Sequence, residues 1–142
     1  MKLPKETQPS GPQRGEIWRA NLEPTVGAEI QKDNRPVLIL TRPSFGTPGV
    51  MLCAPITDYK PERDKRRFWR VVVGDTAESG LDKISCADIS QTRALDISRF
   101  TSQDGKAHPS EVAATAAALS KAVGIVPPKA PKDEKSKEAE NQ

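Results

Sequence analysis

Two stretches of the chain decide its fold: residues 34–40 read NRPVLIL, and residues 50–57 read VMLCAPIT. Val37–Leu40 is a continuous apolar run directly after Pro36, a pattern that predicts a strand buried on both faces. Val50–Ile56 is a second short run and predicts another strand. Because 13 Pro and 9 Gly separate such short runs along the chain, we expect a mainly β fold.

Further strand-like segments lie on either side of this pair. In residues 16–22, the apolar residues Trp18, Ala20 and Leu22 alternate with polar ones, which predicts a half-buried strand. The other segments are short runs between turn residues: Phe68–Val73, a bent strand over Ser85–Ile89 and Gln91–Ala94, and a short strand around Arg99–Thr101.

The C-terminal part of the chain has a different period. Within Glu111–Val123, apolar residues recur at i, i+4, i+7 and i+11 and predict one buried face of a helix: Val112, Ala116, Leu119 and Val123. Pro109 fits the first helical position, with Glu111 as the third and Gly124 as the stop; Ser110 as N-cap is the alternative. Five or six short strands and a terminal helix favour a small, curved antiparallel barrel capped by that helix.

Composition indicates one domain with polar ends. Apolar residues make up 35% of the 142 residues, and the deficit lies in residues 1–13 and 127–142. We therefore expect two disordered tails around a domain spanning residues 14–126. Cys53 and Cys86 lie in strand-like segments without a CxxC pair, and we expect both to be small buried hydrophobes. With no secretory segment and no run near the ~18 residues of a membrane span, we expect a cytoplasmic protein without membrane contact.

Positive charge is concentrated in one segment. The formal net charge is +3, but residues 59–70 (YKPERDKRRFWR) alone hold six basic and two acidic residues. Such a segment can attract phosphates, and it can equally be a solvated hairpin loop, so charge alone leaves nucleic-acid binding open. The single histidine, His108, cannot build a two-histidine ribonuclease site or a typical zinc site, and we expect no metal and no cofactor.

Six motifs, each weak alone, occur in a fixed order between residues 14 and 126. They are RGEIW (14–18), NLEPTVGAE (21–29), NRPVLIL (34–40), APIT (54–57), GLDKIS (80–85) and QTRALD (91–96). As an ordered set they resemble the MazF/PemK family of toxin endoribonucleases from type II toxin–antitoxin systems. The resemblance implies an SH3-like antiparallel β-barrel of the MazF/CcdB kind with a C-terminal α-helix, and normally a homodimer.

The same resemblance implies a function. MazF-like toxins are sequence-specific, metal-independent mRNA interferases. They cleave single-stranded RNA by attack of the 2′-OH, leave 2′,3′-cyclic phosphate and 5′-OH ends, and inhibit translation and growth. The implied partners are single-stranded RNA and a MazE-like antitoxin, whose acidic and apolar segment is expected to lie along the RNA groove.

Arg35 and Thr57 match the family's catalytic pair. A guanidinium can bind two phosphate oxygens at once, so we expect Arg35 to stabilise the phosphorane and Thr57 to hydrogen-bond the phosphate. Arginine, with a pKa above ~12, is an awkward general base, and Glu29 is the best carboxylate for that task or for binding a base edge. From spacing alone, Arg35 also fits an exposed residue at the start of a strand, and Thr57 also fits a residue that forms a turn.

The remaining candidates are expected to bind RNA. They are basic residues of the 59–70 segment, its tryptophan and two residues of the predicted 91–94 strand: Lys60, Arg63, Lys65, Arg66, Arg67, Trp69, Gln91 and Arg93. Trp69 could stack on a base, although an aromatic residue in a strand is more often part of the core. His108 fits a helix start better than a catalytic role.

Two other functions stay open on the sequence. A CcdB-like toxin resembles this fold, lacks the Arg/Thr pair, and acts without catalysis by binding a protein target such as gyrase. An inert barrel that binds nucleic acid is the second alternative. The presence of Arg35 and Thr57 favours the enzyme.

Overall fold

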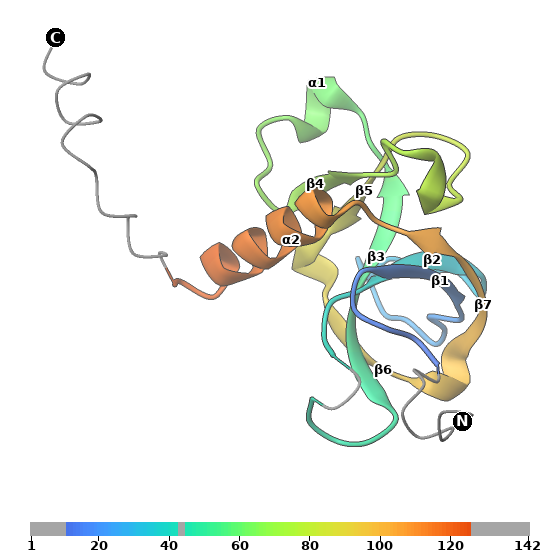
Figure 1. Cartoon of the computed structure of the whole chain (residues 1–142). Coiled ribbons are helices and arrows are strands. Elements are labelled where there is room, and N and C mark those ends of the chain that lie inside the picture. Colours follow the sequence, from blue (N-terminus) through green and yellow to red (C-terminus); the bar gives the residue numbers. More distant parts are fainter. Residues whose placement is uncertain (1–10, 43–44, 126–142) are drawn as a thin grey trace, which may run out of the picture.

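The computed structural model describes residues 11–42 and 45–125 (Figure 1). Within these residues, seven strands form one sheet: β1 (Glu16–Ala20), β2 (Arg35–Ile39), β3 (Val50–Asp58), β4 (Arg70–Val73), β5 (Ser85–Asp88), β6 (Arg93–Asp96) and β7 (Phe100–Lys106). The helical elements are α1 (Pro61–Asp64), α2 (Pro109–Ala122) and the single turns η2 (Ala77–Ser79), η3 (Ile89–Gln91) and η4 (Ile97–Arg99).

The sheet is antiparallel and curled. Its strand order is β4-β5-β3-β2-β1-β7, and β6 also pairs with β3. The long strand β3 pairs with β6 along Val50–Cys53 and with β5 along Ile56–Asp58, which bends the sheet around it. The predicted mainly β fold with a C-terminal helix is confirmed; within the described residues the barrel is curled but not closed, because β4 and β7, at the two ends of the strand order, do not pair with each other.

The central strand β2 separates two hydrophobic cores. Val37, Leu38 and Ile39 are all fully buried, which confirms the strand predicted to be buried on both faces. Leu38 packs into the core that α2 covers, whereas Val37 and Ile39 pack into the second core. Because successive side chains of a strand point to opposite faces, one short apolar run supplies both cores.

The helix α2 begins as predicted but buries a different face. His108 is the N-cap, Pro109 is the first helical residue and Glu111 completes a capping box, so the alternative with Ser110 as N-cap is wrong. Among the four residues predicted to form the buried face, Ala116 and Val123 are exposed.

Thr115 and Ala118 take their places on the buried face, next to Val112 and the half-buried Leu119. The Thr115 hydroxyl donates to the Val112 carbonyl (2.6 Å), so its polar atom is satisfied inside the core. The pattern of apolar residues missed this face because one of its members is a threonine.

Several strand boundaries differ from the predictions. The predicted bent strand over residues 85–94 is two strands, β5 and β6, separated by η3. The break occurs where the Asp88 carboxylate accepts a hydrogen bond from the Ser90 backbone N–H and starts the η3 turn. Phe68 and Trp69 precede β4 instead of lying in it.

Cys53 and Cys86 are both buried as predicted, and burial raises the pKa of the Cys53 thiol to about 12.

Most of the two predicted tails lies outside the described residues. At the N-terminal side, Pro12 is buried and the Gln13 backbone N–H donates to the Glu16 carboxylate (2.8 Å), so contacts with the domain begin before Arg14. None of the helices in residues 11–42 and 45–125 has the length and apolar character needed to cross a membrane.

Candidate functional site

Strand pairing brings Arg35 and Thr57 together. In the β2–β3 ladder, Val37 lies opposite Pro55 and Leu38 opposite Ala54. Continued two residues further, this antiparallel register places Arg35 opposite Thr57. Side chains of directly opposite residues share a face of the sheet, with Cα atoms about 4.5–5.5 Å apart. Both residues line one pocket of about 270 Å³ at this end of the sheet.

Arg35 is held by its own backbone surroundings. Its Nε donates to the Gln31 carbonyl (2.9 Å) and its Nη1 to the Ile56 carbonyl (3.2 Å). Nη2 makes no hydrogen bond to another described residue. Burial lowers the pKa of Arg35 and the charge of Asp58 opposes this effect. The result is a fixed guanidinium with one nitrogen left for a ligand.

Thr57 presents a second unengaged group. It is half-buried in β3, paired across the sheet with Cys86 of β5. Its hydroxyl makes no hydrogen bond to another described residue. An arginine nitrogen and a threonine hydroxyl, both held on strands, therefore face the same pocket and can donate to one anionic group.

The pocket contains charged residues that the sequence analysis did not select. Among them are Lys32, Asp58 and Lys83. Lys83 Nζ lies 3.0 Å from an Asp58 carboxylate oxygen, and this hydrogen bond and charge hold the pKa of Asp58 below its usual value. A signal was present, since Asp58 directly follows Thr57 and Lys83 is part of the GLDKIS motif.

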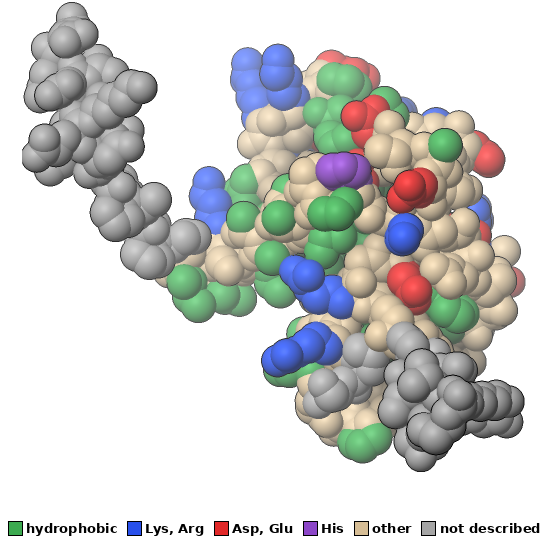
Figure 2. Space-filling model, in the orientation of Figure 1, with side chains coloured by type: hydrophobic (Ala, Val, Ile, Leu, Met, Phe, Trp, Pro, Cys, Tyr) green, Lys and Arg blue, Asp and Glu red, His purple; other side chains and the backbone are tan. Residues whose placement is uncertain are grey.

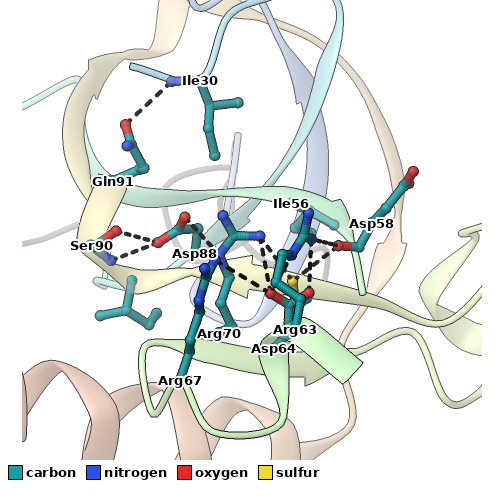
Figure 3. Close-up of polar contacts among 12 residues, drawn as sticks. Ile30, Ile56, Asp58, Arg63, Asp64, Arg67, Arg70, Asp88, Ser90 and Gln91 are labelled. Carbon is teal, nitrogen blue, oxygen red and sulfur yellow. Dashed lines mark hydrogen bonds and ion pairs between the residues drawn. The ribbon is translucent and has the colours of Figure 1, made fainter. Parts of the chain in front are cut away.

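Glu29, Gln91 and Arg93 line a different, neighbouring pocket of about 340 Å³. The Gln91 side chain accepts from the Ile30 backbone N–H (Figure 3) and donates to the Ala28 carbonyl, both at 3.3 Å.

The two other predicted residues in this neighbouring pocket also bond to the backbone of the loop before β2. Arg93 Nη1 donates to the Leu22 carbonyl (2.9 Å), and Glu29 accepts from the Val26 backbone N–H (2.6 Å). All three predicted residues therefore fasten the loop that leads into Arg35.

The basic segment is organised around a buried acid. Asp64 is 1% exposed and receives a two-bond contact from Arg63, with Arg67 and Arg70 at 3.8 Å. The hydrogen bonds from Arg63 hold the pKa of Asp64 far below its usual value.

The other basic residues of the segment are Lys60, Lys65 and Arg66. They are exposed and form no ion pair with the part of the chain that is described. Figure 2 shows Lys and Arg side chains gathered around α1 and the turn after it.

Trp69 packs against the core covered by α2 and is half-buried. Its ring meets Phe68 edge to face, with centroids 5.3 Å apart. Phe68 is 40% exposed and lies under the Lys121 ammonium, so it is the more open aromatic ring of the pair. His108 caps α2, as a helix-start residue would. In residues 11–42 and 45–125, no three His, Cys, Asp or Glu side chains are placed to hold a metal ion.

The family model described as PemK-like, MazF-like toxin of type II toxin-antitoxin system matches residues 13–123. The chain belongs to this family. The match includes Arg35, Thr57 and both pockets, so the toxin domain carries the whole candidate site. Comparison with curated protein sequences gives no match.

Solved structures show the same fold. MazF from Deinococcus radiodurans is 24% identical with a TM-score of 0.67, covering 82% of this chain and 100% of its own. An endoribonuclease from Mycobacterial species, in complex with its cognate antitoxin, is 18% identical with a TM-score of 0.62, covering 83% and 100%. The Mycobacterium tuberculosis toxin MazF-mt6 is 26% identical with a TM-score of 0.58, covering 78% and 98%.

Proposed function

We propose that this toxin is a sequence-specific endoribonuclease that cleaves single-stranded RNA without a metal ion. The observation that carries the proposal is the pocket in which Arg35 and Thr57 stand opposite each other with a guanidinium nitrogen and a hydroxyl unengaged. One solved structure of this fold is itself named an endoribonuclease.

The proposed reaction is an internal transfer at phosphorus. The 2′-oxygen attacks the adjacent phosphorus and loses its proton, the bond from phosphorus to the 5′-oxygen breaks, and the 5′-oxygen takes up a proton. The phosphorane between these steps gathers negative charge on its non-bridging oxygens. Arg35 Nη2 and the Thr57 hydroxyl donate to those oxygens from fixed positions, which lowers the barrier because the donors need no reorganisation.

A carboxylate of the pocket is the proposed proton acceptor. Asp58 lines the pocket next to Thr57, whereas Glu29 lies in the neighbouring pocket with Gln91 and Arg93. We assign the 2′-OH proton to Asp58, and a base-edge contact to Glu29. The lowered pKa of Asp58 keeps it ionised at neutral pH, ready to accept a proton, although it makes the group a weak base.

RNA binding is assigned to two surfaces. The exposed Lys60, Lys65 and Arg66 contact phosphates, while Arg63 and Arg67 add charge from their positions beside Asp64. Gln91 and Arg93 shape the pocket that receives a base. Trp69 contributes only through its exposed edge, because the rest of its ring packs on the core.

The proposed protein partners are a MazE-like antitoxin and a second copy of the chain. Relatives of the same fold have been solved in complex with a cognate antitoxin or as MazE-MazF. The apolar residues Val37, Leu38 and Ile39 are buried within one chain and give no support to a dimer interface. Light scattering at micromolar concentration tests the dimer directly, and a monomer would count against it.

The experiment for the proposed activity is cleavage of a mixed RNA pool in EDTA, with mapping of the cut ends. We expect discrete cuts at one short motif, with 2′,3′-cyclic phosphate or 3′-phosphate on one side and 5′-OH on the other. The Arg35→Lys variant serves as the control for contaminating ribonuclease. Strict dependence on Mg²⁺, or no cleavage at all, would contradict the proposal.

A further inference from the structure

A buried carboxylate lies beneath the basic segment and next to the candidate site. Asp64, the last residue of α1, accepts hydrogen bonds from the Lys60 backbone N–H (2.9 Å), from Arg63 Nε (2.8 Å) and from Arg63 Nη2 (2.9 Å). Its oxygens are thus surrounded by donors. A buried carboxylate that accepts several hydrogen bonds is held in one conformation. The guanidinium that donates two of them is held in one conformation as well.

The first arm of this network reaches the candidate site. Arg63 Nη2 also donates to the Asp58 carbonyl (3.2 Å), and the Cys86 thiol contacts the same oxygen at 3.5 Å (Figure 3). Asp58 is the last residue of β3 and follows Thr57 directly. The guanidinium of Arg63 therefore ties the buried Asp64 to the strand end that presents the Thr57 hydroxyl.

The second arm runs toward the neighbouring pocket. Arg70 lies between two buried acids, with Nη1 3.8 Å from Asp64 and Nε 2.9 Å from Asp88. The other Asp88 oxygen accepts from the Ser90 backbone N–H (3.0 Å) and hydroxyl (2.5 Å). The next residue, Gln91, holds the loop that leads into Arg35. Figure 3 shows the side chains of Ser90, Asp88, Arg70 and Asp64 side by side.

We propose that Asp64 is a positioning residue for RNA cleavage: through the hydrogen bonds of Arg63 it fixes the end of β3 that carries Thr57, and through its charge beside Arg70, which forms an ion pair with Asp88, it supports η3 and the loop before Arg35. The proposal rests on the proposed function. Stability alone is a weak reason for such a network, because buried ion pairs often stabilise a fold no better than apolar side chains of similar volume. Control of geometry is the stronger reason, since a misplacement of about 1 Å at a reacting centre can cost about 100-fold in rate.

The first test compares two acids of the same helix. Asp64→Asn and Glu62→Gln each remove one negative charge from α1, but Glu62 is exposed and forms no ion pair with the described residues. If only charge mattered, both variants would bind RNA slightly more tightly and cleave equally well. The amide introduced by Asp64→Asn can accept with one oxygen only and turns a donor toward Arg63 or Lys60. We therefore expect kcat to fall about tenfold or more for Asp64→Asn alone.

The second test keeps the positive charge at position 63 and removes the two-point guanidinium contact with Asp64. Arg63→Lys can still attract a phosphate, but a lysine cannot grip Asp64 at two points and also reach the Asp58 carbonyl. We expect kcat to fall about tenfold while the affinity for 2′-O-methyl RNA, which lacks the attacking hydroxyl, stays within about twofold. Arg14→Lys, at an exposed arginine outside both pockets, is the matched control.

The readouts separate this proposal from the proposed function. Thermal melting shows whether each variant is folded; if Asp64→Asn is not, Arg63→Lys carries the test. Parental kcat in both folded variants overturns the positioning role. Hydrogen exchange at the Thr57 and Asp58 amides is read without any activity. If the parent protein fails to cleave RNA, the proposed function is wrong. Hydrogen exchange is then the remaining test of the positioning role. Faster exchange than in the controls supports positioning, and unchanged exchange overturns it.

Discussion

The two neighbouring pockets contain similar residue types and differ in what their polar atoms do. In the Arg35–Thr57 pocket, Nη2 of Arg35 and the Thr57 hydroxyl make no hydrogen bond to a described residue. In the pocket of Glu29, Gln91 and Arg93, each side chain is bonded to the backbone of the loop before β2. The first pocket presents two unengaged donors to a new anion, whereas each predicted side chain of the second already holds the loop through at least one hydrogen bond.

From this difference in hydrogen bonding, we can rank the candidate residues by the expected effect of a substitution on the rate and on the stability. A donor that is already fixed and unengaged stabilises a transition state without reorganisation. A side chain that fastens a loop contributes to function mainly by keeping the loop in place, and its loss reduces stability as well as activity. Substitution of Thr57 should therefore lower the rate with little loss of stability, and substitution of Gln91 should do the reverse, whereas Arg35, which also bonds to the Gln31 and Ile56 carbonyls, should affect both.

Arg35→Lys is expected to have the largest effect. Lysine keeps the charge that attracts RNA but lacks the planar fork, and losing one preorganised donor costs about 10²–10³ in rate. The variant should stay folded, with some loss of melting temperature because the guanidinium hydrogen bonds to the Gln31 and Ile56 carbonyls are lost, and its affinity for 2′-O-methyl RNA should stay close to that of the parent. Single-turnover cleavage measures the rate. A variant that cleaves like the parent would place the reaction elsewhere on the molecule.

Thr57→Val should follow with a smaller loss. Valine keeps the branched shape and removes the hydroxyl, and a hydrogen bond to a charged group contributes about 1.5–3 kcal/mol, or about 10–100-fold in rate. Thr57→Ser, which restores the hydroxyl, is the matched control and should recover most of the activity. Equal cleavage by the valine and serine variants would show that the hydroxyl has no role.

Asp58→Asn tests which carboxylate accepts the proton. We expect a loss of about tenfold, at the low end for a general base because the lowered pKa makes Asp58 a weak one. Because the pKa of Asp58 is lowered, its carboxylate becomes protonated only at a pH below the usual pKa of an aspartate. Titration of Asp58 should therefore leave the parental rate flat between about pH 5 and 8. Asp82→Asn, in the same pocket, is the control; a greater loss in Glu29→Gln would reverse the assignment.

Replacing Lys60, Lys65 and Arg66 together by serine should weaken binding without changing the motif. Three phosphate contacts on a single strand account for about 2 units in the slope of log affinity against log salt. The same measurement on the parent supplies the reference. An unchanged slope would mean that the exposed basic residues are only solvated charges.

Gln91→Ala should have the smallest effect on rate, about a few-fold, and a visible one on stability. It removes two hydrogen bonds to the loop, each contributing about 0.5–1.5 kcal/mol. Urea unfolding gives the free energy of unfolding, and end mapping shows whether the cleavage motif has changed. A large rate loss at full stability would mean that Gln91 contacts the reacting group instead.

The basic segment shows where prediction from the sequence stopped. As a string, YKPERDKRRFWR is a net positive patch. In the structure, Asp64 is buried and engages Arg63, Arg67 and Arg70, so only part of that charge is open to RNA. Nothing in the local pattern distinguishes Asp64 from the exposed Glu62 two positions earlier. The face of α2 was missed in the same way, because the buried Thr115 is polar in the sequence and satisfied only inside the core.

The sequence by itself determined most of the short strands, the start of α2 and the family, and it pointed to Arg35 and Thr57 as the candidate pair, because alternation, capping residues and ordered motifs are local properties of the chain. The tertiary structure alone decided that β2 and β3 align in a register that sets Arg35 opposite Thr57, and that Glu29 belongs to another pocket. It also decided which polar atoms are already bonded. Pairing register and hydrogen bonds between distant segments depend on how the whole sheet packs, and no short stretch of sequence contains that information.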